Sequence, residues 1–206
     1  MTWQVWLAFL GASVAISLSP GAGAVVSMST GLAVGLRRGY WNILGLQIGV
    51  LAQIAVVSIG LGAVLAGSDV AFQVIKWFGV AYLAYLAVGQ WRAAPAEADV
   101  TVAVTDLSPR ALVTRGFLVN ASNPKAVVFM LAVLPQFITP GRALVPQYLT
   151  IAATMVVVDV LVMTGYTGFA SRVLGALRSP RQQRAVNRGF ACAFALAALL
   201  LALLRH

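Results

Sequence analysis

A long apolar run that is interrupted at its midpoint by Ser19, Pro20 and Gly21 constrains this sequence more than any other feature. The run extends from Trp3 to about Leu36, which is roughly twice the ~20 residues that a helix needs to cross a bilayer. A helix should break at the proline because its nitrogen carries no hydrogen and its ring disfavours helical backbone at the preceding residue. Lipid cannot satisfy the backbone groups exposed by such a break, so we expect it to face other protein or a wet cavity.

A second interruption lies in the apolar run from Arg110 to Ile138, where Asn120, Asn123, Pro124 and Lys125 occur together. Interrupted segments at corresponding places in two halves of a chain are typical of transporters that bind substrate near the middle of the membrane. The two breaks therefore predict a substrate-binding site between them.

The composition is that of an integral membrane protein. Of 206 residues, 61% are hydrophobic and 9% are charged, whereas a soluble domain carries about 25% charged residues. The expected fold is all-α, with six transmembrane segments of which the first and fourth are broken at Pro20 and Pro124. The predicted segments are 3–36, 41–66, 70–91, 110–138, 144–171 and 185–204.

The basic residues predict how the chain is oriented. They gather after the first, third and fifth segments, at Arg37, Arg38, Arg92, Arg110, Arg115, Arg172, Arg178, Arg181, Arg184 and Arg188. The positive-inside rule places these connections in the cytoplasm and both termini outside. Residues 92–109 read as a cytoplasmic linker between repeats at 1–91 and 110–206. Three segments in each repeat would invert the second relative to the first.

Glycines recur at helical spacing at Gly31, Gly35, Gly39, Gly45 and Gly49. Small residues at this spacing allow helix backbones to approach closely. Ordinary packing within one bundle is one interpretation of this stripe, and the interface of a homodimer is the other.

Asp159 lies at the centre of the fifth segment, where an ionised side chain costs about 3 kcal/mol even on a lenient scale. Lys125 is at the same nominal depth. In one interpretation these residues form a structural ion pair. In the other they hold a zwitterion, with Asp159 near its ammonium and Lys125 near its carboxylate, aided by the helix N-termini that follow Pro20 and Pro124. Asp159 is also the candidate proton-coupling group, because burial favours the neutral carboxyl form.

The candidate substrate-binding residues are therefore Ser19, Pro20, Gly21, Asn120, Asn123, Pro124, Lys125 and Asp159. Other intramembrane amides, Asn42, Gln47 and Gln53, are expected chiefly to form hydrogen bonds between helices.

Several other classes of function have little support in the sequence. One cysteine, Cys192, and one histidine, His206, give too few ligands for a transition-metal site. No motif or intramembrane histidine supports an enzyme, so we expect no catalytic residue, metal or cofactor. The net charge of +9 sets orientation in a membrane protein rather than indicating nucleic acid.

These motifs resemble the LysE/RhtB family of amino-acid exporters along the whole chain. The resemblance rests on Ser19-Pro20-Gly21, on Asn123-Pro124-Lys125-Ala126 followed by Pro135-Gln136-Phe137, and on Asp159. Ala22 stands where the family usually has a second proline. The resemblance implies a protein of the bacterial inner membrane that exports amino acids such as lysine, homoserine, threonine or leucine, driven by the proton motive force. The alternatives are export of another small metabolite, lipid scrambling and a non-transporting membrane component.

Overall fold

The computed structural model describes residues 1–65, 69–92, 108–139, 141–170 and 180–203. All regular structure in these ranges is helical, so the expected all-α class is confirmed for them. Most of the predicted linker at 92–109, as well as His206, lies outside the described residues. The helices are α1 (Trp3–Leu18), α2 (Ala22–Leu65), α3 (Asp69–Arg92), α4 (Pro109–Ala121), α5 (Pro124–Val133), the 3₁₀ helix η1 (Leu134–Phe137), α6 (Leu144–Gly168) and α8 (Pro180–Leu203).

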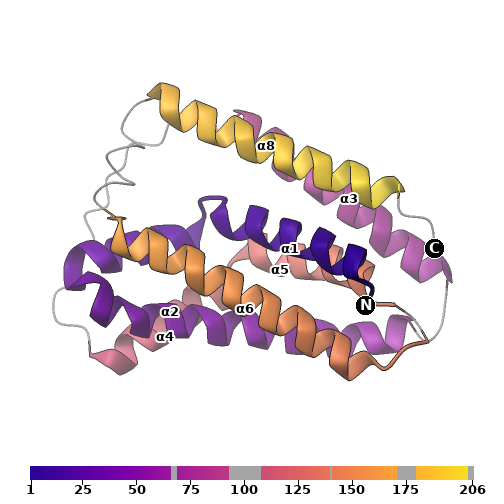
Figure 1. Cartoon of the computed structure of the whole chain (residues 1–206), viewed down its shortest axis with the longest axis horizontal. Coiled ribbons are helices and arrows are strands. Elements are labelled where there is room, and N and C mark those ends of the chain that lie inside the picture. The colour runs from indigo at the N-terminus through magenta and orange to yellow at the C-terminus, as the bar shows by residue number, and fades with distance from the viewer. Residues whose placement is uncertain (66–68, 93–107, 140, 171–179, 204–206) are drawn as a thin grey trace.

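The helices form a bundle in which two short helices occupy the middle. α2 packs against both α4 and α6, and α3 packs along α8. α1 and α5 cross the space between these two groups, with α1 against α6 and α5 against α3 (Figure 1). The C-terminal end of α1 and the N-terminal end of α5 therefore lie inside the bundle, where other helices surround them.

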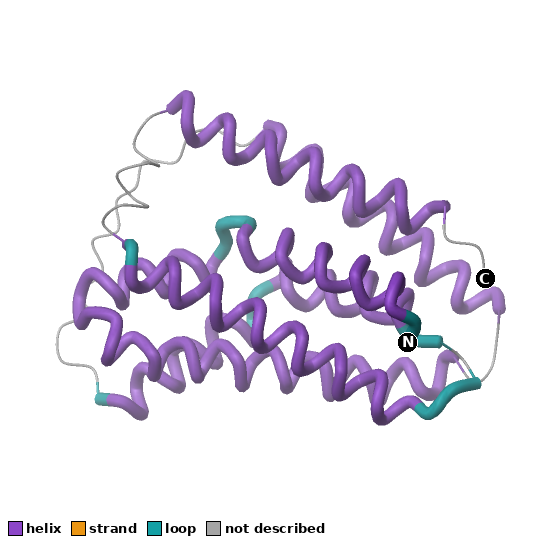
Figure 2. Tube along the Cα trace, viewed as in Figure 1, coloured by secondary structure: helices purple, strands orange, loops and turns teal. Residues whose placement is uncertain are grey.

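Two short non-helical loops lie near the middle of the molecule (Figure 2). α1 ends at Leu18, and Ser19 has extended backbone before α2 begins at Ala22. α4 ends at Ala121, and α5 begins at Pro124 with Asn123 as its N-cap. Proline suits the first position of a helix because a backbone N–H at that position would have no acceptor within the helix, so its absence costs nothing.

α2 changes direction at Gly35, whose φ of 73° lies in the left-handed region. Glycine adopts this backbone without the steric cost that a side chain brings. The sequence predicts a connection between separate segments ending at 36 and starting at 41. The structure instead makes the change of direction at this one residue, and residues 36–40 are helical.

The glycine stripe brings helices of the same chain into close contact. A Cβ at Gly45 in α2 would overlap the backbone carbonyl of Val113 in α4, and a Cβ at Gly31 would overlap the carbonyl of Thr167 in α6. Backbones this close leave room only for hydrogen at these positions. The stripe thus packs within the bundle, which is the first of its two interpretations.

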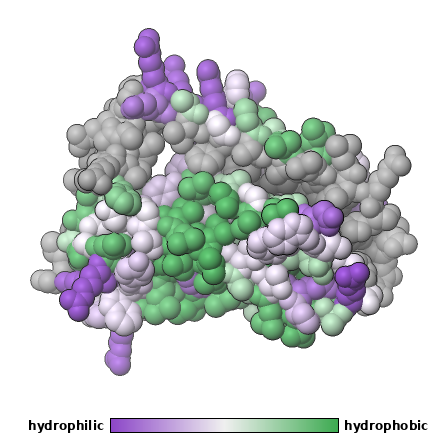
Figure 3. Space-filling model, viewed as in Figure 1, coloured by the Kyte–Doolittle hydropathy of each residue, from purple (hydrophilic) through white to green (hydrophobic). Residues whose placement is uncertain are grey.

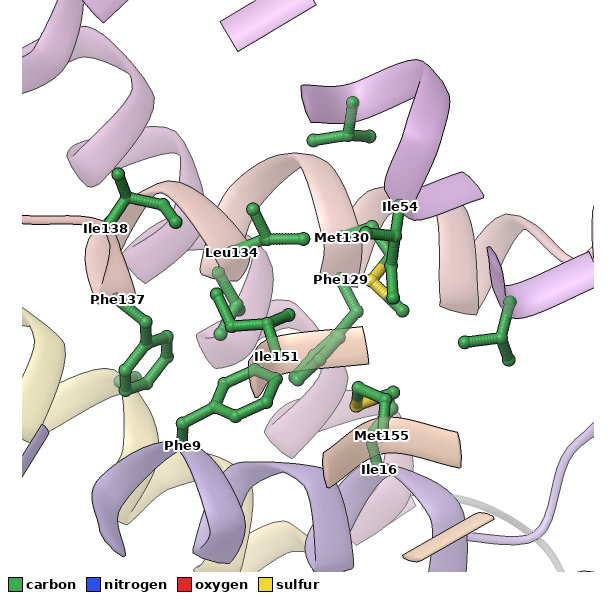
Figure 4. Packing of buried hydrophobic residues seen from close by; sticks show 14 of the residues in the cluster. Phe9, Ile16, Ile54, Phe129, Met130, Leu134, Phe137, Ile138, Ile151 and Met155 are labelled. Atoms are coloured by element: carbon green, nitrogen blue, oxygen red, sulfur yellow. The ribbon is translucent and has the colours of Figure 1, made fainter. Parts of the chain in front are cut away.

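Large apolar side chains from α1, α2, α5, η1 and α6 pack together inside the bundle (Figure 4). Phe9 of α1 meets Phe137 of η1 edge to face, with ring centroids 5.0 Å apart. Ile151 of α6 and Leu134 of η1 are also fully buried in this cluster. Such contacts hold membrane helices together through close packing, because lipid is as apolar as the side chains.

The outside of the molecule is also apolar. Ile59 and Leu161 are 79% and 68% exposed, and Figure 3 shows hydrophobic residues across the middle of one face, with hydrophilic residues toward its edges. Among the described residues, two helical stretches are long and apolar enough to cross a membrane, Ala22–Ile59 and Leu144–Gly168. Such a surface suits contact with lipid.

Candidate functional site

A cavity of about 60 Å³ lies where the two loops approach each other. We call it the central cavity. Its polar lining residues are Ser17, Ser19, Asn120, Asn123, Lys125 and Asp159. Its apolar lining includes Leu46, Val50, Phe129, Met130, Met155 and Met163, and the first turns of α2 and α5 contribute Gly23, Ala24 and Ala126. This volume has room for a few water molecules and is well below the roughly 300 Å³ of a small ligand pocket.

Lys125 links the two loops across the central cavity. Its ammonium nitrogen Nζ donates to the backbone carbonyl of Ser19 over 2.9 Å, while its backbone N–H donates to the side chain of Asn123 over 3.1 Å. The carbonyls at the end of α1 carry partial negative charge, so a cation is favourable there. Tyr166 of α6 donates to the neighbouring carbonyl of Leu18 over 2.6 Å. The end of α1 is thereby held by α5 and α6.

Asp159 lines the central cavity from α6 and is 8% exposed. Its Oδ2 accepts a hydrogen bond from Nε2 of Gln47 in α2 over 2.6 Å. Ser17, in the last turn of α1, lines the same cavity, and its Oγ is buried with no hydrogen-bond partner among the described residues. A buried carboxyl group needs a donor such as Gln47, because the apolar surroundings do not replace the water it has lost. Asp159 is thus held by a helix from the first half of the chain.

Asn120 fixes the second loop against α2. Its side-chain nitrogen donates to the carbonyl of Leu46 over 2.8 Å, and its own carbonyl accepts from Nε2 of Gln53 over 2.8 Å. The end of α4 therefore has hydrogen-bond partners although it lies inside the bundle, where an unpaired carbonyl would be costly.

The structure brings most of the candidate residues together. Ser19, Gly21, Asn120, Asn123, Lys125 and Asp159 all line the central cavity. Pro20 is not among its lining residues, and the side chain of Pro124 lies outside the described part of the structure. Pro20 lies between α1 and α2, and Pro124 is the first residue of α5, so the two prolines set helix boundaries rather than offering polar groups to the cavity.

Sequence reasoning assigned Gln47 only an interhelical hydrogen bond and did not connect it with Asp159. It also missed Ser17, which lies one turn from the first break. The only signal for either residue is a polar side chain inside an apolar segment, and the sequence does not say which polar groups meet.

The family model described as "LysE type translocator" matches residues 14–205. The chain is 43% identical, over the full length of both proteins, to the homoserine/homoserine lactone efflux protein of Salmonella typhi. It is also 43% identical to an uncharacterized membrane protein of Vibrio cholerae, over 98% of each chain.

A more distant relative is the leucine efflux protein of Klebsiella pneumoniae. It is 27% identical over 164 residues, which cover 77% of this chain and 76% of the relative. No solved structure matches the chain.

Proposed function

Because this chain belongs to the family of LysE type translocators, we propose that it exports a small amino acid or amino-acid derivative from the cytoplasm by proton-driven alternating access. The family places it among membrane transporters rather than enzymes. The observation that carries the proposal is the central cavity, where both helix interruptions meet the half-buried Lys125 and the buried Asp159.

Homoserine and its lactone are the substrates that we consider first. They are named for the Salmonella typhi protein, which aligns with this chain over its whole length. Both compounds carry an amino group, and homoserine also carries a carboxylate. Leucine is named for a relative of lower identity and partial coverage, so it has a weaker claim.

The chemistry of the central cavity suits a zwitterion. In our proposal the substrate's ammonium lies near Asp159, and its carboxylate replaces the Ser19 carbonyl as the partner of Lys125 Nζ. The first turns of α2 and α5 line the same cavity, and the N-terminal end of a helix attracts a carboxylate. Ser19, Gly21, Asn120 and Asn123 then surround the substrate, while Pro20 and Pro124 set the helix ends.

Alternating access is needed because the central cavity is smaller than an amino acid in this conformation. In the proposed cycle, the helices around it separate on the cytoplasmic side to admit substrate and on the opposite side to release it. The Lys125–Ser19 hydrogen bond closes the cavity between these two states.

Some of the helix contacts are consistent with two repeats of three segments. In such an arrangement α1 corresponds to α4, and the part of α2 after Gly35 corresponds to α6. Exchanging the repeats then turns the contact between α1 and α6 into the contact between α4 and α2, and both contacts are present. The contact of α3 with α8 then corresponds to itself. We therefore propose repeats at 1–91 and 110–206, in an inner membrane, with the arginine-rich connections in the cytoplasm and both termini outside.

Asp159 is the proposed proton carrier. It is the acidic side chain that lines the central cavity, and binding of a proton there would compete with binding of the substrate's ammonium. A proton that enters from outside would release the substrate and then leave to the cytoplasm, so that one cation replaces another at each turn of the cycle.

Efflux from cells loaded with dipeptides tests this proposal. Cells with and without the protein are compared, and all amino acids in the medium are followed with and without a protonophore. We expect faster release of homoserine or a related compound, which the protonophore stops. If no amino acid or derivative responds while the protein is present in the membrane, the proposal is wrong.

A further inference from the structure

The side-chain amide of Gln47 has a hydrogen-bonded donor and an unsatisfied acceptor. Its Nε2 donates to Asp159 over 2.6 Å, whereas its Oε1 is buried and has no hydrogen-bond partner within the described part of the chain. The side chain is only 5% exposed. An unsatisfied buried acceptor costs about 1–3 kcal/mol, so this arrangement calls for an explanation.

The two ends of the amide match the two protonation states of Asp159. An ionised carboxylate accepts hydrogen bonds only, and the NH₂ of Gln47 is the donor that it requires. A protonated carboxyl group can donate, and it then requires an acceptor such as Oε1. A half-turn about the terminal side-chain torsion exchanges the two ends, and this torsion is broad and roughly two-fold.

We propose that Gln47 is a positioning residue for proton coupling: its amide turns over when Asp159 gains or loses a proton, so that the carboxyl group keeps a partner in both states. This inference rests on the proposed function, in which Asp159 carries the proton. The proton comes from water on one side, binds one carboxyl oxygen and leaves to water on the other side. Gln47 itself neither gains nor loses a proton.

The position of Gln47 explains why this exchange affects the transport cycle. It joins α2 to α6, and these helices correspond to each other in the two proposed repeats. Ser17, in the last turn of α1, lines the same cavity as this carboxyl group. A change of the hydrogen bond at Asp159 therefore alters the contact between the two halves of the chain.

Other groups around Asp159 also bear on its titration. Lys125 of α5 lines the same cavity, and Tyr166 lies two turns further along α6, where it donates to Leu18. From α1 and α2 the nearby polar side chains are Ser17, which lines the cavity, and Gln47, which donates to Asp159, and neither of them titrates. A variant of Gln47 thus changes the partner of Asp159 without changing any charge.

Gln47→Met is the test variant, since methionine has a similar length and neither donates nor accepts strongly. Gln53→Met is a matched control. Gln53 also lies in α2, is 8% exposed, and has a donating Nε2 with an Oε1 lacking a partner within the described residues, but its partner is the backbone carbonyl of Asn120 rather than a carboxylate.

The measurement is the infrared difference spectrum of the purified full-length protein as a function of pH. The carbonyl band of a protonated carboxyl group reports Asp159 directly and requires no transport, and the Asp159→Asn spectrum identifies that band. Gln47→Met removes the hydrogen bond of both protonation states, but the bond to the ionised carboxylate is the stronger of the two, so the midpoint of this band should move toward higher pH by up to about one pH unit. Gln53→Met should retain the wild-type midpoint.

The spectra distinguish failure of the role proposed for Gln47 from failure of the role proposed for Asp159. An unchanged midpoint in Gln47→Met would overturn the role of Gln47 and leave the exporter proposal standing. If no titrating band disappears in Asp159→Asn, the proton-carrying role fails and this inference fails with it. If Gln47→Met does not fold, the amide carbonyl band of the wild-type protein answers the question. That band must shift together with the carboxyl band, and a constant amide band contradicts the turnover.

Discussion

Replacement of Lys125 should separate substrates that carry a carboxylate from those that do not. In our proposal the ammonium nitrogen of Lys125 leaves the Ser19 carbonyl, to which it donates over 2.9 Å, and binds the substrate's carboxylate. Homoserine has this group, whereas in homoserine lactone it is an uncharged ester. Lys125→Met keeps the length of the side chain and removes both the charge and the donor.

The expected effect follows from the kind of hydrogen bond that is lost. A hydrogen bond to a charged group contributes about 1.5–3 kcal/mol, which corresponds to about 10- to 150-fold in affinity. One between a lysine and a neutral ester is worth less than one to a carboxylate. If the bond to the ester is worth about half as much, we expect export of homoserine to fall by about three- to tenfold more than export of the lactone.

The assay is the uptake of each radiolabelled compound by proteoliposomes preloaded with the same unlabelled compound, at matched amounts of folded protein. Lys125→Gln is the control for the structural hydrogen bond, since it keeps an N–H donor for the Ser19 carbonyl but carries no charge. It should show the same preference for the lactone. Equal losses for both compounds would refute the assignment of Lys125 to the carboxylate.

Three further variants test other parts of the structure. Asp159→Asn should abolish net efflux driven by a proton gradient and should also weaken solute exchange, because asparagine neither carries the proton nor offers a charge to the substrate's ammonium. Proteoliposomes with and without a pH gradient measure both activities, and gradient-driven efflux at the wild-type rate would contradict the role of Asp159. Gly45→Ala should destabilise the protein by about 1–3 kcal/mol, because the added methyl meets the backbone of α4. Gly165→Ala, at a position with open space, is its control in the same unfolding assay and should be neutral or slightly stabilising. Tyr166→Phe removes the hydrogen bond to Leu18 and should lower stability by about 0.5–1.5 kcal/mol; unchanged unfolding would show that this bond does not hold the end of α1.

The features that the sequence predicts best are those that the chemistry of a single residue determines. Proline lacks an N–H wherever it occurs, so breaks are expected at Pro20 and Pro124, and the helices flanking these positions end at Leu18 and Ala121. An acid within an apolar segment marks a buried polar site for a similarly local reason. Asp159 accordingly lies at the central cavity.

The sequence said less about which polar groups meet. Gln47 and Gln53 look alike within α2, yet one contacts a carboxylate and the other a backbone carbonyl. The difference depends on how α2 crosses α4 and α6, and those crossings are set by glycine contacts such as that of Gly45 with Val113. The turn at Gly35 was also missed, because glycine is tolerated in a helix as well as in left-handed backbone.

The pairing of α3 with α8 has a consequence for biosynthesis. α3 ends at Arg92, but α8, with which it makes its most extensive contact, begins only at Pro180. A chain emerging from the ribosome therefore completes α1, α2, α4 and α6 before the partner of α3 exists. During that interval lipid, or the insertion machinery, must cover the face of α3 that α8 later occupies. A chain that stops before Pro180 leaves this face of α3 uncovered. Insertion of α8 therefore completes the packing of the first half of the molecule as well as that of the second.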